Sequence, residues 1–252
     1  YINYSAAYDD LFRTLSQESG RAVETVGTWP ENRPPRPDEG LAKHLVVLHA
    51  RGQTVAADSR RLHEGFWANA PDPLRARAVF CAGRMLGAGP VSQDALERLL
   101  ALWEGRAAEI QAGDPGEHSH ELAAFGSWFS SGRFDAAWSL EQLAAVMKLL
   151  ARVPGENGAP LWPLYNATEH LERYVADHPA ATLECVAALL ELSGAALGLG
   201  LWMSHVRAVL DAARGHADGS IRQRATELAN RCVAYGDESF RDLSEPPDPE
   251  AE

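Results

Sequence analysis

The chain has 252 residues, of which 46% are hydrophobic and 23% charged, and its formal net charge is −12 with a pI near 5.2. This composition is too apolar for a disordered chain. A surface this acidic repels the phosphate backbone, which argues against non-specific nucleic-acid binding. No apolar run approaches the roughly 18 residues that a membrane-spanning helix needs, and no signal peptide is visible.

The first 38 residues differ from the remainder of the chain. We expect one helix over residues 4–15, followed by a linker or extended arm where prolines crowd residues 29–37. At the other end, residues 244–252 are rich in acids and prolines, and we expect a disordered tail there because such a segment cannot pack.

Between these ends, residues 39–243 show apolar side chains at steps of three and four, which predict successive amphipathic helices. Three examples are Leu96, Leu99, Leu100, Trp103, Ala107 and Ile110; Leu143, Val146, Met147, Leu150 and Val153; and Ile221, Ala225, Leu228, Ala229, Cys232 and Val233. No segment alternates with the period of two that a strand flanked by hairpin turns would show. The sequence therefore predicts an all-α protein.

Residues that favour helix ends support this prediction. Asp72 before Pro73 predicts a capped start for a helix over residues 74–86. Ser139 with Gln142 predicts a capping box, and Trp138 directly before Ser139 fits a hydrophobic staple. Glycines and prolines at residues 87–90, 113–116 and 154–158 predict the breaks between helices.

Grouped in pairs, the helices begin near Glu39, Asp72, Glu117, Pro160 and Gly200, about 40 residues apart, which is the period of HEAT or armadillo repeats. One helical hairpin cannot bury both of its faces, so neighbouring hairpins must stack. We therefore expect a HEAT-like α-α superhelix, or solenoid, of about five helix pairs over residues 39–243.

The segment 125–143 (FGSWFSSGRFDAAWSLEQL) resembles part of the C-terminal helical-repeat regions of large bacterial multidomain proteins. There, an aromatic-rich helix is followed by a Ser-Gly-Lys/Arg-Phe-Asp turn, then by Trp and a Leu-rich helix. Residues 40–45 through 83–86, and residues 229–231 with 239–243, look similar too, so the resemblance covers roughly residues 39–243.

In that family the helical region usually follows a signalling or effector module, often a NACHT-type or related P-loop ATPase, in anti-phage conflict systems. The resemblance implies a sensor or scaffold role and a partner that is either another protein or an adjacent domain of the same chain. It transfers no functional residue. The connection over residues 192–201 departs from the family, because it is rich in Gly and Ala where the family has a charged turn.

The aromatic residues Phe125, Trp128, Phe129, Phe134 and Trp138 allow two interpretations. They could form an exposed recognition patch, since Trp and Phe anchor binding hot spots. Because Phe125, Trp128 and Phe129 share one helical face, the spacing favours the core between two helices.

No catalytic, cofactor or metal site is predicted. The segment His118, Ser119, His120 and Glu121 suggests metal ligands, but its two histidines point to different helix faces, so an exposed helix N-terminus is the better interpretation. Residues 194–200 lack the Lys-Ser/Thr of a P-loop and predict a flexible turn. The three cysteines are far apart and odd in number, which predicts buried free thiols in a reducing cytoplasm.

One basic concentration stands out in this acidic chain. It could form a stripe that binds an anion or docks a partner, although such residues more often solvate an outer face. Its members are Arg60, Arg61, Arg75, Arg77 and Arg84.

We therefore predict a non-catalytic module that binds macromolecules or senses a ligand, without membrane contact. One alternative is self-assembly, with residues 1–37 docking onto a neighbouring copy. A weaker alternative is a nucleic-acid or nucleotide sensor that uses the arginine stripe.

Overall fold

The structure, a computed structural model, describes residues 49–50, 52, 64–153, 162–196 and 202–244. The helix and arm expected over residues 1–38 and the tail over residues 245–252 lie outside the described residues, as do Arg60 and Arg61. Ser244, which the prediction placed in the tail, ends the last helix.

The described part of the chain is all-α, as predicted, and contains no strand. Residues 64–69 are helical, and the α-helices after them are α4 (Asp72–Ala88), α5 (Gln93–Ala112), α6 (Ser119–Ala124), α7 (Gly126–Ser130), α8 (Ala136–Leu150), α9 (Trp162–Thr168), α10 (Pro179–Ala196), α11 (Met203–Arg214), α12 (Gly219–Ala234) and α13 (Arg241–Ser244). Short 3-10 helices are η3 (Pro115–His118), η4 (Leu171–Tyr174) and η6 (Glu238–Phe240). None of the described helices is both long and apolar enough to cross a membrane.

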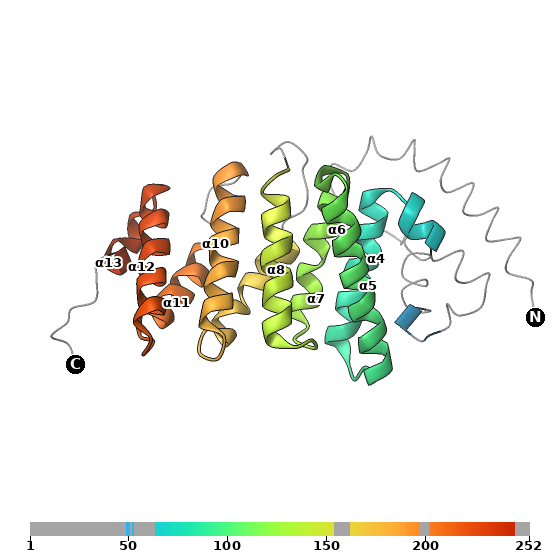
Figure 1. Cartoon of the computed structure of the whole chain (residues 1–252), viewed down its shortest axis with the longest axis horizontal. Coiled ribbons are helices and arrows are strands. Elements are labelled where there is room, and N and C mark those ends of the chain that lie inside the picture. Colours follow the sequence, from blue (N-terminus) through green and yellow to red (C-terminus); the bar gives the residue numbers. More distant parts are fainter. Residues whose placement is uncertain (1–48, 51, 53–63, 154–161, 197–201, 245–252) are drawn as a thin grey trace, which may run out of the picture.

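The helices form two layers along the long axis of the molecule (Figure 1). In one layer α8, α10 and α12 stand side by side. In the other, α7 contacts α9, and η4 contacts α11. The helices α4, α5 and α6 lie at one end of the array and α13 lies at the other, against α12. The chain passes from one layer to the other at successive connections.

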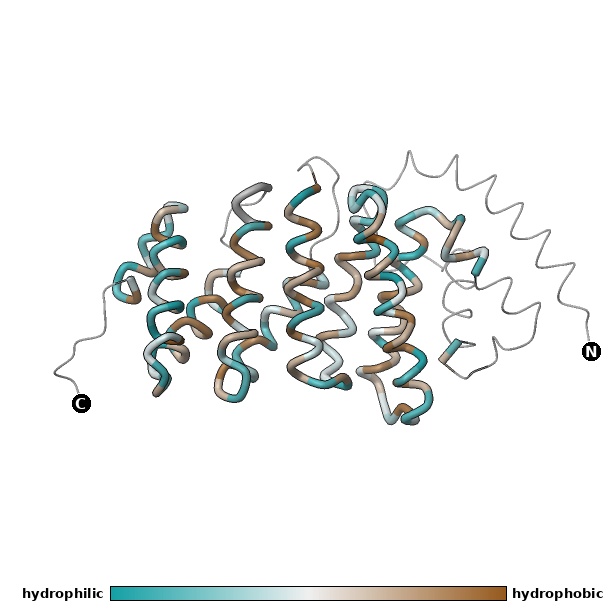
Figure 2. Tube along the Cα trace, viewed as in Figure 1, coloured by the Kyte–Doolittle hydropathy of each residue, from teal (hydrophilic) through white to brown (hydrophobic). Residues whose placement is uncertain are grey.

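The side chains of the apolar stripes predicted from the sequence are buried or half-buried. Figure 2 shows hydrophobic and hydrophilic segments alternating along the helices, as expected for amphipathic helices. In α12, for example, Ala225, Leu228, Ala229 and Cys232 are all fully buried. Burial of such side chains is the main stabilising contribution, at about 1.5–3 kcal/mol for each large one.

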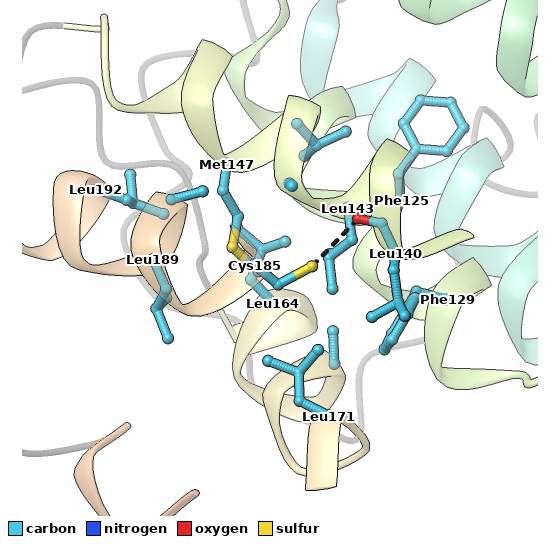
Figure 3. Packing of buried hydrophobic residues seen from close by; sticks show 14 of the residues in the cluster. Phe125, Phe129, Leu140, Leu143, Met147, Leu164, Leu171, Cys185, Leu189 and Leu192 are labelled. Atoms are coloured by element: carbon cyan, nitrogen blue, oxygen red, sulfur yellow. Dashed lines mark hydrogen bonds between the residues drawn. The ribbon is translucent and has the colours of Figure 1, made fainter. Parts of the chain in front are cut away.

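The joint between α8 and α10 is packed with aliphatic and sulfur-containing side chains (Figure 3). Leu140, Leu143 and Met147 of α8 lie against Cys185 and Leu189 of α10, and all five are fully buried. The Cys185 thiol donates a hydrogen bond of 3.1 Å to the carbonyl oxygen of Leu140. Burial raises the pKa of this thiol to about 12, so it stays protonated, as expected for a structural cysteine.

The start of α8 differs from the prediction. The helix begins at Ala136, and the carboxylate of Asp135 caps it by accepting a hydrogen bond of 2.9 Å from the N–H of Trp138. Ser139 is instead buried inside the helix, where its hydroxyl donates to the carbonyl of Ala136 at 3.1 Å. The predicted capping box at Ser139 is therefore wrong, because a better cap stands four residues earlier.

The start of α4 also differs. The helix includes Asp72 and follows Pro71, and no side chain caps it. The Asp72 carboxylate instead accepts hydrogen bonds from the backbone N–H groups of His120, at 2.8 Å, and Glu121, at 2.9 Å. Asp72 thus satisfies donors in the first turn of α6, a different helix.

Candidate functional site

Three charged side chains are buried together where α4, α5 and α6 meet. Arg75 of α4 is 7% exposed, Arg106 of α5 is 5% exposed and Glu121 of α6 is 0% exposed. Oε1 of Glu121 accepts a hydrogen bond from Nε of Arg106 at 2.6 Å. Its Oε2 accepts from Nε of Arg75 at 2.8 Å and from Nη2 of Arg106 at 2.9 Å. We call these residues, with Asp72 and His118, the charged cluster.

The guanidinium of Arg75 also binds two backbone carbonyl groups, one just before α4 and one just before α6. Its Nη1 donates to the carbonyl oxygen of Ala70 at 2.5 Å, just before α4. Its Nη2 donates to the carbonyl of Glu117 at 2.9 Å, in η3, and lies 3.0 Å from Nδ1 of His118. Arg75 therefore connects α4 with both η3 and α6.

The guanidinium of Arg106 is enclosed in a similar way. Its Nη1 donates to the carboxylate of Glu109, one turn further along α5. Its Cζ lies 5.3 Å from the ring centroid of Trp67, a geometry that permits a cation–π interaction. Arg106 thus reaches α6 through Glu121 and the segment before α4 through Trp67.

Glu121 remains ionised despite its burial. Burial by itself would raise the pKa of its carboxyl, but hydrogen bonds from His118 and Arg106 and the positive charges of Arg106 and Arg75 outweigh burial and lower this pKa to about 2. The same attraction raises the pKa of Arg106, against the opposing effect of burial. The side chains of Arg75 and Arg106 thus pair with the carboxylates of Glu121, Asp72 and Glu109.

Residues 118–121 do form a helix N-terminus, because α6 begins at Ser119, but the predicted exposure of this segment is wrong. Ser119 is 2% exposed and Glu121 is 0% exposed. The histidine side chains are partly buried, and His118 Nδ1 lies 3.2 Å from Oε2 of Glu121. The segment is buried because α4 and α5 supply partners for its charge at a distance in sequence that local periodicity cannot reveal.

The residues Ser119, His120 and Asp72 do not form a catalytic triad. In a triad the carboxylate and the nucleophile use different imidazole nitrogens, so that the ring can pass a proton from one side to the other. Here Nδ1 of His120 faces both groups, with Asp72 Oδ2 at 3.0 Å and Ser119 Oγ at 3.5 Å. Among the described residues no group of three or more His, Cys, Asp or Glu side chains has a metal-holding arrangement.

Of the five arginines predicted to form a stripe, the structure describes Arg75, Arg77 and Arg84, and it removes Arg75 from the surface. Arg75 is buried in the charged cluster, so it does not lie on an open surface. Arg77 and Arg84 are exposed on α4, and the Cζ of Arg77 lies 5.9 Å from the ring centroid of Phe80. The structure therefore brings together Arg75 and Arg106, a pair that the sequence did not suggest.

The aromatic residues belong to the core, as the spacing favoured. Phe125, Trp128 and Phe129 are at most 2% exposed, while Phe134 and Trp138 are partly buried against them. Trp103 of α5 is the centre of this group, which the sequence did not indicate. Its ring stacks on Phe125 at 5.0 Å between centroids and meets Trp128, Phe134 and Trp138 edge-on at 5.1–5.8 Å.

Two further predictions concern small sites. The helix α10 continues to Ala196, so the predicted turn at residues 194–200 begins later than expected, and residues 197–200 lie outside the described part. None of the three cysteines forms a disulfide; Cys185 and Cys232 are buried, as predicted, whereas Cys81 is half-buried.

A signal for the charged cluster was present in the sequence. Arg106 falls on the apolar stripe of α5, at the spacing set by Leu99, Trp103 and Ile110. Arg106 is buried there, whereas the neighbouring Ala107 is only partly buried. In the same way, Arg75 precedes Val79 by one turn on the buried face of α4. A charged residue on an apolar stripe predicts a buried ion pair, although not its partner.

Comparison of the chain with protein-family models, with curated proteins and with solved structures gives no match.

Proposed function

We propose that the chain is a HEAT-like helical-repeat module that binds another macromolecule and has no catalytic role of its own. The observation that carries this proposal is the two-layer succession of helices. Helices that open successive pairs begin at Asp72, Ser119, Trp162 and Met203, about 40–47 residues apart, the period of HEAT and armadillo repeats. Such stacks offer long surfaces to partners.

The chemistry of the charged cluster supports binding over catalysis. A catalytic acid or base must reach a substrate, and its pKa should lie near the working pH. Glu121 is fully buried, four donor atoms surround its carboxylate, and its pKa is about 2. These groups satisfy one another, which is the behaviour of a structural ion-pair network.

The exposed charges of α5 favour a basic protein as the partner. Its exposed charged side chains are all acids, namely Asp94, Glu97, Glu104 and Glu109. Of its two arginines, Arg106 is buried and Arg98 donates to the carbonyl oxygen of Ala50. Complementary charge speeds association and discriminates between partners, and acidic surfaces disfavour nucleic acid.

The family resemblance of residues 39–243 adds a context to this proposal. It suggests that the module is the C-terminal part of a larger bacterial defence or signalling protein and acts in the cytoplasm. Binding of a partner would then pass to an attached effector or ATPase domain through shifts in the packing between helices.

Charge reversal on α5 tests the proposal. Partners captured by chemical crosslinking to the purified chain would be identified, and their affinities would be measured by calorimetry. We expect Glu97→Lys with Glu104→Lys to weaken binding about tenfold or more, and added salt to weaken binding to the parent chain. Both positions are exposed, so folding should not change.

The matched control is Glu172→Lys with Asp177→Lys, at two exposed positions in and just after η4, which adds the same charge elsewhere. A partner that binds both variants equally well would contradict the assignment of the acidic α5 surface as its binding site. Binding of DNA or RNA at low salt would favour the nucleic-acid sensor instead. A reversible dimer in light scattering would favour self-assembly, although Tyr235 is the one large hydrophobic side chain that is exposed in the described part.

A further inference from the structure

We propose that the charged cluster is a latch that fixes a single register between α6 and the pair α4 and α5. The joint would then open as a unit and would not slide. This inference is independent of what the chain binds, because it concerns only how the first helices of the array are held together.

The contacts that hold α6 are directional and come from two helices. Asp72 of α4 accepts from two successive backbone N–H groups of α6, at 2.8 and 2.9 Å. Arg75 of α4 donates hydrogen bonds to the Glu121 carboxylate, at 2.8 Å, and to the Glu117 carbonyl oxygen, at 2.9 Å. Arg106 of α5 forms a two-pronged pair with the same carboxylate, at 2.6 and 2.9 Å.

A small displacement of α6 would break several of these contacts together. Hydrogen bonds weaken steeply with distance and angle. A guanidinium or carboxylate group that loses its partner while it is still buried carries a large cost in stability, because its charge is then uncompensated. Since the buried side chains of Arg75, Arg106 and Glu121 share these bonds, a partial slip leaves charge unpaired. Only complete opening, which lets water reach every group, avoids that cost.

The joint between α8 and α10 has the opposite character. Leu143, Met147, Cys185 and Leu189 meet there, and their contacts are mainly non-directional. Methionine adapts readily to altered packing. Small adjustments between helices should therefore occur at this apolar joint. The latch, in contrast, keeps α6 in a fixed register against α4 and α5.

Apolar replacement of the three central charges tests the latch. The variant carries Arg75→Met, Glu121→Leu and Arg106→Met. Nitroxide labels on Ala101→Cys of α5 and Glu117→Cys of η3, the turn directly before α6, are both at exposed positions and report the distance across the joint by pulsed electron resonance. Cys81→Ala removes the half-buried thiol, and Cys185 and Cys232 remain unreactive because burial raises the pKa of each to about 12.

We expect one narrow distance in the parent chain and a broad or divided distribution in the apolar variant, with Tm unchanged or higher. A second label pair, on Ala145→Cys and Ala180→Cys, spans the α8 and α10 joint and should be unaffected. One narrow distance in a stable apolar variant would overturn the latch, because packing alone would then fix the register.

Hydrogen exchange of Glu121→Gln provides a test that does not depend on folding of the triple variant. Loss of the carboxylate charge should speed exchange of the α6 amides about tenfold more than that of the α12 amides. Lys148→Met, which removes the exposed pair with Glu184, is the control and should leave α6 unchanged. Equal acceleration in α6 and α12 would show that Glu121 contributes only to global stability, and the latch would be rejected.

Discussion

At the scale of single residues, the ionisation of Glu121 is the main link between pH and the stability of the fold. A carboxyl group whose pKa is about 2 in the folded chain and about 4.5 in the unfolded chain stabilises the fold above pH 4.5. That stabilisation is lost as the pH falls from 4.5 toward 2. The difference corresponds to about 3 kcal/mol of unfolding free energy, as an order of magnitude.

We therefore predict that Glu121→Gln reduces the fall in unfolding free energy between pH 6 and pH 3. Glutamine cannot ionise, so this part of the pH dependence disappears with the carboxyl group. Urea denaturation at several pH values would measure the change. Glu104→Gln, at an exposed position, is the control and should keep the parent slope. If both variants lose stability on acidification as the parent does, the buried ion pairs do not cause its acid sensitivity.

The residues of the cluster also show what sequence reasoning could and could not supply. The positions of Arg75 and Arg106 on apolar stripes can be read from local spacing. Their common partner cannot be identified from local spacing, because Glu121 lies 46 residues from Arg75 and 15 from Arg106. Residues 118–121 were misassigned for this reason, since a segment with two histidines and a glutamate has no local sign of burial.

At the scale of elements, α4 and α7 approach closely at a glycine. A Cβ atom at Gly83 would lie 2.2 Å from Oγ of Ser127 and 2.8 Å from its carbonyl carbon. Because a backbone atom is involved, the two helices would have to separate. Gly83→Ala should therefore lower the unfolding free energy by about 1–3 kcal/mol, the range for overpacked cores.

Gly105→Ala is the matched comparison. Gly105 is an exposed position within α5, and a Cβ there has nothing within 4 Å. The higher helix propensity of alanine should raise the unfolding free energy by about 0.5–1 kcal/mol. Chemical denaturation of both variants gives the sign of each effect. A Gly83→Ala chain as stable as Gly105→Ala would show that α4 and α7 do not pack as described.

The cap that Asp72 provides for α6 gives a second prediction at this scale. Asp72→Ala should cost about 2 kcal/mol, since hydrogen bonds to a charged acceptor are worth more than neutral ones. Asp135→Ala removes an exposed local cap of α8 and should cost about 1 kcal/mol. Urea denaturation compares the two. A smaller loss for Asp72→Ala would mean that water satisfies the α6 donors equally well.

Helix positions were easier to predict than helix ends. The expected start at residue 39 lies outside the described residues. Those at 72, 117, 160 and 200 lie within three residues of observed helix starts at 72, 119, 162 and 203, because apolar periodicity and breaks rich in Gly and Pro are local signals. The caps were wrong at Asp72 and Ser139. An acid near a helix start can cap any N-terminus within reach, and only the tertiary arrangement decides which one.

At the scale of the whole molecule, the proposed stacking of helix pairs predicts that stability is local. Each pair in such an array contacts only its neighbours, so a defect at one end should weaken that end first. The end formed by η6 and α13 is suitable for this test, because these elements lie against α12. Phe240 is fully buried there, and the Cζ atom of Arg207 lies over its ring, 6.0 Å from the ring centroid.

Phe240→Ala should cost about 3–5 kcal/mol, as is typical when a buried aromatic ring is removed. Hydrogen exchange should show the loss of protection in α11 and α12, while the amides of α4 and α6 remain close to the parent. Tyr235→Ala, at a side chain 46% exposed, is the control and should change little. If protection instead falls equally from α4 to α12, the molecule unfolds as one cooperative core. A partner bound at one end could then influence the other end only through unfolding of the whole, and the proposed relay between stacked helix pairs would have no physical basis.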